Sequence, residues 1–153
     1  MGIVVDTNVF IDAQNARLDL ASLPLLQTEP VYIAAITVAE LLAGVKMAKT
    51  ANEHIRRHAY AEKLLTHMPV IAFETEIARI YAELYAYILN ETKRSKINVH
   101  DLQIAATALA SGHTVLTSNL DDFIGIPGLQ VFSPYENSNV HEAPAGYGGN
   151  GSS

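Results

Sequence analysis

Near the start of the chain, the run Gly2-Ile3-Val4-Val5-Asp6-Thr7-Asn8 places three β-branched residues directly before three polar ones. An unbroken β-branched run of this kind is typical of a strand that is buried on both faces of a parallel sheet. The polar residues that follow end the strand in a turn. The run therefore predicts a buried strand over Gly2–Val5, with the carboxylate of Asp6 directly after its C-terminal end.

Four further apolar runs predict strands at Val31–Ile36, Val70–Phe73, Thr114–Thr117 and Leu129–Phe132. Between them, apolar residues at three- and four-residue steps predict helices at Thr37–Met47, Asn52–His67, Glu74–Thr92 and Asp101–Ser111. Strands that alternate with helices form a parallel sheet that is covered on both faces. We therefore expect an α/β fold with a central parallel five-stranded sheet flanked by helices on both faces.

The composition indicates one globular domain. The 153 residues are 49% hydrophobic and include no cysteine, which excludes a disulfide scaffold, a thiolate metal site and a cysteine nucleophile. After Tyr135 the chain becomes rich in Asn, Ser, Gly and Pro. Such a segment buries too little apolar surface to order itself, so we expect a domain over residues 1–135 and a flexible tail over residues 136–153.

No segment of the sequence is expected to enter a membrane. The first ten residues lack the basic start of a signal peptide and carry Asp6 where an apolar run should be. The uncharged stretch Leu102–Leu120 is long enough to span a bilayer, but polar residues interrupt it. This stretch fits a buried helix, a turn and a strand, and we expect a cytoplasmic protein.

Acidic residues stand where the predicted strands end or where the adjoining helices begin. Asp6 follows the first strand, and Glu40 lies near the start of the helix after the second strand. Asp101 opens the helix before the fourth strand, and Asn119 and Asp122 follow that strand. Ligands of open α/β sheets bind beyond the carboxyl ends of the strands. The topology can therefore draw these five side chains to one edge of the sheet.

Each of these side chains also has a purely structural interpretation, which is weakest for Asp6 because its carboxylate directly follows a buried strand. Thr37 and Glu40 have the spacing of a capping box, and the helix dipole favours an acid such as Asp101 in a first helical turn. Asn119 and Asp122 could cap the turn that follows them. A capping residue can also be a ligand, so these interpretations leave a joint site open.

Carboxylates that are brought together repel one another and raise one another's pKa values. A hard divalent cation such as Mg²⁺ or Mn²⁺ relieves this repulsion, because it takes oxygen ligands and is commonly held by a few carboxylates together with phosphate oxygens. Such an ion polarises a phosphodiester and lowers the pKa of a bound water. The pattern therefore points to a phosphodiesterase that acts on nucleic acid.

The distribution of charge supports a nucleic-acid partner, although the net charge does not. The formal net charge is −6, which taken alone disfavours binding to a polyanion. Nine of the ten Lys and Arg residues, however, lie between Lys46 and Lys96. The candidate contacts to a nucleic-acid backbone are Lys46, Lys49, Arg56 and Arg57. The alternative is that these residues form a solvated helix face.

Four segments of the sequence carry a family resemblance: Val5–Asn8, Thr37–Gly44, His100–Ala108 and Thr117–Phe123. Together they resemble the four blocks of the PIN domain and, more narrowly, those of the VapC-type ribonuclease toxins of bacterial toxin–antitoxin pairs. The resemblance covers Met1–Tyr135. One block alone is weakly specific, but four blocks in this order and at this spacing are strongly specific.

The resemblance implies a PIN-like fold and an endoribonuclease that depends on Mg²⁺ or Mn²⁺ and acts on RNA such as transfer or ribosomal RNA. It also implies a homodimer that is inhibited by a VapB-type antitoxin. Asp6, Glu40 and Asp101 match the three best-kept acids of the family. The fourth acidic position matches Asn119, an amide, and Asp122 is the nearest acid that can replace it. We therefore expect Asp6, Glu40, Asp101 and Asp122 to be the metal ligands, and the resemblance leaves open whether one ion or two bind.

The sequence leaves two main functional classes open. One is the metal-dependent endoribonuclease, and the other is a catalytically silent PIN-like module that binds RNA or a protein. Metal binding by the acids and cleavage of RNA separate the two classes. A phosphorylated receiver domain is a third α/β possibility, but it requires adjacent acids after its first strand, and Asp6-Thr7-Asn8 supplies only one.

Overall fold

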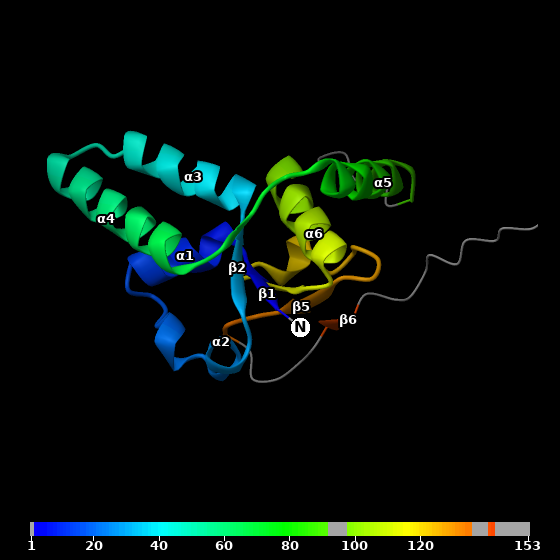
Figure 1. Ribbon diagram of the computed structural model, residues 1–153, viewed down its shortest axis with the longest axis horizontal. Coiled ribbons are helices and arrows are strands. Elements are labelled where there is room, and N and C mark those ends of the chain that lie inside the picture. Colours follow the sequence, from blue (N-terminus) through cyan, green and yellow to red (C-terminus); the bar gives the residue numbers. More distant parts are fainter. Residues whose placement is uncertain (1, 92–97, 136–140, 143–153) are drawn as a thin grey trace, which may run out of the picture.

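The computed structural model describes residues 2–91, 98–135 and 141–142, and it confirms the expected α/β fold (Figure 1). The strands are β1 (Ile3–Val5), β2 (Val31–Ala34), β3 (Val70–Ile71), β4 (Thr114–Leu116), β5 (Gln130–Phe132) and β6 (His141–Glu142). They lie in the order β3-β2-β1-β4-β5-β6. All pairs from β3 across to β5 are parallel, whereas β6 pairs with β5 in the antiparallel sense.

Helices cover both faces of the sheet, as the sequence predicts. They are α1 (Thr7–Gln14), α2 (Pro24–Thr28), α3 (Ala35–Lys46), α4 (Ala51–His67), α5 (Thr75–Glu91) and α6 (Val99–Ser111), with short 3₁₀ turns η1 (Leu20–Ser22) and η2 (Leu120–Asp122). α1, α3 and α4 lie on one side of the sheet, and α5 and α6 lie on the other (Figure 1). α3 and α4 form a hairpin that extends away from the sheet.

Successive side chains of β1 point into two different cores. Ile3 and Val5 pack in one core with Phe10 of α1 and with residues of α3 and α4. Val4, between them, packs in the other core with Ile104 of α6 and with residues of α5. Neither face of β1 meets solvent, which explains why its sequence is an unbroken apolar run rather than an alternating one.

The sheet reverses its direction of growth at β1. β2 and β3 lie on one side of β1, and β4 and β5 lie on the other. In open α/β sheets a ligand crevice forms at the carboxyl ends of the strands at such a switch point. α1 and α3 start at this edge because they follow β1 and β2, and α6 starts there because it runs back across the sheet before β4. Three helix N-termini therefore meet at one edge.

The boundary between β2 and α3 differs from the predicted one. β2 ends at Ala34 and α3 begins at Ala35, two residues before the predicted start at Thr37. The pairing of β2 with β3 stops at Ala34 and Ile71. Beyond that pair the backbone has no partner on this side and continues as a helix.

The expected flexible tail requires a correction at two residues. His141 and Glu142 lie within residues 136–153, and their backbone forms β6 against Val131 and Gln130 of β5. A sheet edge presents unpaired N–H and C=O groups, which a segment can bind without contributing to the core. Residues 136–140 and 143–153 of the expected tail lie outside the described residues. In the part of the chain that is described, no helix is both long and apolar enough to cross a bilayer.

Candidate active site

Asp6 lies at the switch point, between the end of β1 and the start of α1. Its side chain is 2% exposed, and its Oδ2 accepts a hydrogen bond of 2.8 Å from the hydroxyl of Thr117, which follows β4. Burial raises the pKa of Asp6 to about 6, although hydrogen bonds from Thr117 and from the backbone of Thr7 oppose the rise. Nearby Glu40 and Asp122 raise this pKa further by repulsion. Thr117, the residue directly after β4, thus holds this carboxylate in one orientation.

Glu40 lies in the second turn of α3 and points toward the site rather than back to the helix N-terminus. Its Oε1 accepts a hydrogen bond of 2.9 Å from the hydroxyl of Thr7, and its Oε2 lies 3.4 Å from Nδ1 of His100. The Thr7 hydroxyl is also hydrogen-bonded to the hydroxyl of Thr37, at 3.0 Å. The predicted capping box is wrong, because α3 begins at Ala35 and Thr37 lies within the helix.

Asp101 lies in the first turn of α6. Asn98 caps this helix, because its Oδ1 accepts hydrogen bonds from the backbone N–H groups of His100 at 3.1 Å and Asp101 at 3.3 Å. The Asp101 side chain is therefore not needed as a cap. Its Oδ2 atom is buried and has no hydrogen-bond partner among the described residues. A buried carboxylate oxygen without a partner is costly unless a proton or a cation satisfies it.

The surroundings of Asp101 disfavour its ionised form more strongly than the surroundings of Asp6 do. Burial raises the pKa of Asp101 to about 8, and repulsion by Asp6 contributes next. Asp122 raises the pKa further, both by hydrogen bonding to the protonated form and by its charge, and Glu40 adds a smaller repulsion. The same four acids that the sequence selects are thus electrostatically coupled across one edge of the sheet.

Asn119 and Asp122 bind each other instead of capping η2. Asn119 Nδ2 donates a hydrogen bond of 2.6 Å to Asp122 Oδ2, and the Asn119 side chain makes no capping bond to η2. Asp122 acts on Asp101 electrostatically, because its charge and hydrogen bonding to the protonated carboxyl both raise the pKa of Asp101. Asp122 is therefore coupled to the other acids itself, whereas Asn119 contacts Asp122.

The donor set fits a hard divalent cation. It consists of carboxylate oxygens, and the partnerless Oδ2 of Asp101 lies among them. Within residues 2–91, 98–135 and 141–142, no three Asp, Glu or His side chains form a ready-made coordination shell. With the side chains in these positions, a cation would contact one or two of the carboxylates directly, and water would fill its remaining positions. Asp6 and Asp101 are the most deeply buried of the four acids.

The residues that orient these acids are not among those selected from the sequence. Thr7 holds Glu40, Thr117 holds Asp6, and buried Thr37 holds Thr7. His100 is half exposed, and its side chain lies against Glu40. Thr7 directly follows Asp6 at the end of β1, and Thr117 follows β4 two positions before Asn119. A polar residue at such a strand end is the sequence signal that could have identified both threonines. The spacing of Thr37 and Glu40 suggests a capping box, which does not form because Thr37 lies within α3.

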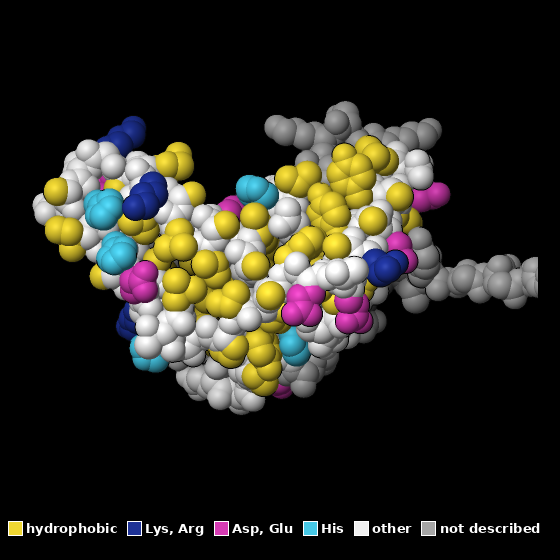
Figure 2. Space-filling view, turned by 45° about the horizontal axis from the view of Figure 1, so that its top comes forward, with side chains coloured by type: hydrophobic (Ala, Val, Ile, Leu, Met, Phe, Trp, Pro, Cys, Tyr) yellow, Lys and Arg dark blue, Asp and Glu magenta, His cyan; other side chains and the backbone are white. Residues whose placement is uncertain are grey.

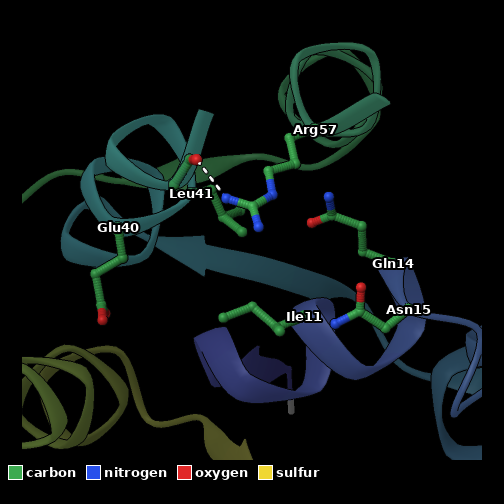
Figure 3. Close-up of a pocket in the computed structure, with 7 residues that line it drawn as sticks. Ile11, Gln14, Asn15, Glu40, Leu41 and Arg57 are labelled. Carbon is green, nitrogen blue, oxygen red and sulfur yellow. Dashed lines mark hydrogen bonds between the residues drawn. The ribbon is translucent and has the colours of Figure 1, made fainter. Parts of the chain in front are cut away.

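The basic residues selected from the sequence separate into two groups. Lys46, Lys49 and Arg56 are exposed around the far end of the α3–α4 hairpin, where Figure 2 shows Lys, Arg and His side chains gathered. We call these three residues the basic arm. Arg57 is half-buried, donates from Nη1 to the Gly44 carbonyl at 2.8 Å and lies 3.9 Å from Glu53. Arg57 faces a pocket beside Glu40 (Figure 3).

Comparison with known proteins adds to this geometry. The PIN domain family model matches residues 3–128. Ribonuclease VapC1 of Rickettsia felis is 31% identical over 135 residues, which cover 87% of this chain and 96% of that protein. Ribonuclease VapC of Rickettsia bellii is 32% identical over 133 residues, with 87% and 96% covered. The crystal structure of VapBC2 from Rickettsia felis bound to a promoter DNA fragment superposes with a TM-score of 0.76 at 29% identity, covering 87% of this chain and 98% of that one.

Proposed function

The chain belongs to the PIN domain family, and on this premise we propose that it is a divalent-metal-dependent endoribonuclease, the toxin of a VapBC-type toxin–antitoxin pair. The observation that carries the proposal is the buried Oδ2 of Asp101, which has no partner among the described residues and is coupled to Asp6, Glu40 and Asp122. The names of the similar proteins, ribonuclease VapC and VapC1, support RNA as the substrate.

Asp6, Glu40, Asp101 and Asp122 would hold the cation, directly or through bound water. We propose that the cation is Mg²⁺ or Mn²⁺ because every candidate ligand is a carboxylate oxygen. When bound, such an ion polarises the phosphodiester and lowers the pKa of a water that attacks it. The chain itself orients the acids: Thr117 holds Asp6, and Thr7 holds Glu40. Nδ1 of His100 lies 3.4 Å from the second carboxylate oxygen of Glu40. The buried threonines keep these carboxylates in place before RNA arrives.

The fourth position of the site yields a graded prediction. Asp122→Asn should lower the rate of metal-dependent RNA cleavage about tenfold or more and weaken metal affinity, because it removes a charge that reaches Asp101. Asn119→Ala should lower the rate only a few-fold, because Asn119 acts by orienting Asp122 through their 2.6 Å hydrogen bond. Initial rates measured against Mn²⁺ concentration check both effects. Full activity in Asp122→Asn, with none in Asn119→Ala, would show that Asp122 is not a ligand.

The basic arm should contact the RNA backbone without reading its sequence. Replacement of Lys46, Lys49 and Arg56 together by Ala should weaken binding to unrelated RNAs alike. It should also reduce the slope of log binding constant against log salt concentration by about two, since each lost phosphate contact on a single strand contributes roughly 0.7. Binding in EDTA at several salt concentrations measures the slope. Arg57 is left in place because it bonds α4 to α3.

The control for the basic arm removes positive charge from other surfaces, through Arg17 and Arg79 together, each replaced by Ala. This control should keep most of the wild-type salt slope. If the basic-arm variant loses no more slope per removed charge than this control, the basic arm is a solvated face and not an RNA-binding surface.

We also propose the partners of the chain. A VapB-type antitoxin is supported by the similarity to a chain of a VapBC complex. A homodimer is supported by the exposed apolar side chains of α5, among them Tyr85 and Leu89, and Figure 2 shows hydrophobic side chains gathered over this region. An enzyme that acts on cellular RNA would work in the cytoplasm.

Expression of the chain in bacteria tests the proposed function. Induction should arrest growth and produce new RNA 5′ ends at a few sites, and co-expression of a small antitoxin gene from beside its own gene should prevent both. A catalytically silent module would produce no new RNA ends, although it could still bind RNA or the antitoxin. Mapping of RNA ends therefore separates the two classes that the sequence leaves open.

A further inference from the structure

A pocket of about 160 Å³ lies between α1, α3 and α4, directly beside Glu40. Ile11, Gln14 and Asn15 line it from α1 and its C-terminal end, Leu41 and Gly44 from α3, and Arg57 from α4. Figure 3 shows Arg57 reaching across from α4 while the Glu40 carboxylate points away from it. Glu40 therefore belongs both to the acidic site and to the pocket lining, which includes no residue of the basic arm.

Gly44 has no structural reason to lack a side chain. It lies inside α3, where glycine costs roughly 0.5–1 kcal/mol of stability relative to alanine. A Cβ atom built on Gly44 meets nothing within 4 Å, and the residue does not adopt a positive φ. Gly44 also lines the pocket. Packing therefore does not require glycine at this position.

The pocket combines apolar walls with planar polar groups. Leu41 and Ile11 supply apolar surface, and Ile11 is 39% exposed. The side-chain amides of Gln14 and Asn15 form no hydrogen bond with the described residues. Arg57 uses Nη1 to bind the Gly44 carbonyl and retains further N–H donors. Amide and guanidinium groups are the side chains that recognise the edges of nucleobases.

We propose that this pocket binds the base of a nucleotide next to the scissile phosphodiester and so sets the sequence preference of cleavage. The inference rests on the proposed ribonuclease activity. A neutral planar base fits better than a phosphate, because the acidic residue Glu40 lines the pocket and the side chains of Ile11 and Leu41 offer no hydrogen bonds. The base lies against these apolar walls while Gln14, Asn15 and Arg57 bind its edge.

Gly44→Leu tests the proposal because it adds a bulky side chain to a residue that lines the pocket and removes no group of the acidic site. Leucine is a good helix former, so the variant should fold with at least wild-type stability. Ala43→Leu is the matched control, since Ala43 is the exposed neighbour on the same helix and does not line the pocket. Thermal melting of both variants verifies that they are folded.

Two measurements on the full chain decide the outcome. The first is sequencing of the RNA ends that the protein produces from a random-sequence RNA pool in Mn²⁺. Wild type and Ala43→Leu should share a preferred base at one position beside the cut. In Gly44→Leu the preference for that base over the others should be at least tenfold weaker. The second is titration with the four nucleoside 5′-monophosphates in EDTA, followed by NMR. One of them should shift the Gly44 and Gln14 amide signals in the wild type and bind at least tenfold more weakly to Gly44→Leu.

These measurements separate the pocket from the activity. Absence of RNA cleavage by the wild type, together with nucleotide binding that Gly44→Leu weakens, would overturn the ribonuclease and support a base pocket. Unchanged base preference and unchanged nucleotide binding in Gly44→Leu would overturn the pocket and leave the ribonuclease intact. If no nucleotide shifts the pocket signals and Gly44→Leu blocks antitoxin binding instead, the pocket is a protein-docking site and the proposal is wrong.

Discussion

Asp101→Asn is expected to reduce metal-dependent RNA cleavage at least a hundredfold and, at the same time, to stabilise the metal-free protein at pH 8. The loss of cleavage follows because the substitution removes the buried carboxylate whose Oδ2 has no partner among the described residues. The gain in stability follows because the new side-chain amide carries no charge beside Asp6, Asp122 and Glu40, which together with burial raise the pKa of Asp101 to about 8. Opposite effects on activity and stability are typical of a functional group held under strain.

Two assays check this prediction. Cleavage of a defined RNA in Mn²⁺ measures activity, and thermal melting in EDTA at pH 8 measures stability. The melting temperature should rise by roughly 3 °C or more, which corresponds to about 1 kcal/mol for a domain of this size. Asp121→Asn is the matched control, since Asp121 is exposed and carries the same charge on η2. A less stable Asp101→Asn variant, with cleavage unchanged, would mean that Asp101 only supports α6.

The stability of the metal-free wild type is expected to fall as the pH rises from about 4 to 8. The pKa of Asp6 is raised to about 6 and that of Asp101 to about 8, from 3.8 in the unfolded chain. Between these values the folded state keeps protons that the unfolded state has lost. Unfolding therefore releases protons, and a rise in pH favours it. The stabilisation from these two groups is complete below pH 4 and is lost as the pH passes through 6 and 8.

A divalent cation should reverse this trend. An ion that binds only the folded state stabilises it by about 2.7 kcal/mol at a concentration of 100 Kd. The stabilisation should be larger at pH 8 than at pH 5, because protons compete with the ion for the carboxylates. Melting curves in EDTA and in millimolar Mn²⁺ or Mg²⁺, with NaCl at equal ionic strength as the control, measure the effect. An equal response to NaCl and to Mn²⁺ at every pH would exclude specific binding at these acids.

The strands and helices could be predicted because each core-facing residue leaves a local signal. Ile3, Val4 and Val5 are all apolar because both faces of β1 are covered, and this pattern is readable without any partner strand. The start of α3 could not be predicted so well, because it depends on where the pairing of β2 with β3 stops. The formation of β6 from His141 and Glu142 depends on an available edge of β5, which local composition does not show.

The acids of the site could be chosen from the sequence because they follow strands whose order brings them together. Their geometry could not, since it depends on hydroxyl contacts across long separations in the chain. Thr117 reaches Asp6 over 111 positions, and Thr7 reaches Glu40 over 33. The role that we propose for Gly44 likewise depends on how α1, α3 and α4 are arranged around the pocket.

If the coupled carboxylates bind a divalent cation that RNA cleavage requires, the rate of cleavage must depend on free Mn²⁺. Protein stripped of metal with EDTA would be titrated with Mn²⁺, and initial rates would be compared for the wild type, Asp101→Asn and Asp121→Asn. We expect no cleavage in EDTA, a saturable rise for the wild type and Asp121→Asn, and a flat response for Asp101→Asn. Cleavage that persists in EDTA, or that Asp101→Asn retains in full, would contradict this expectation.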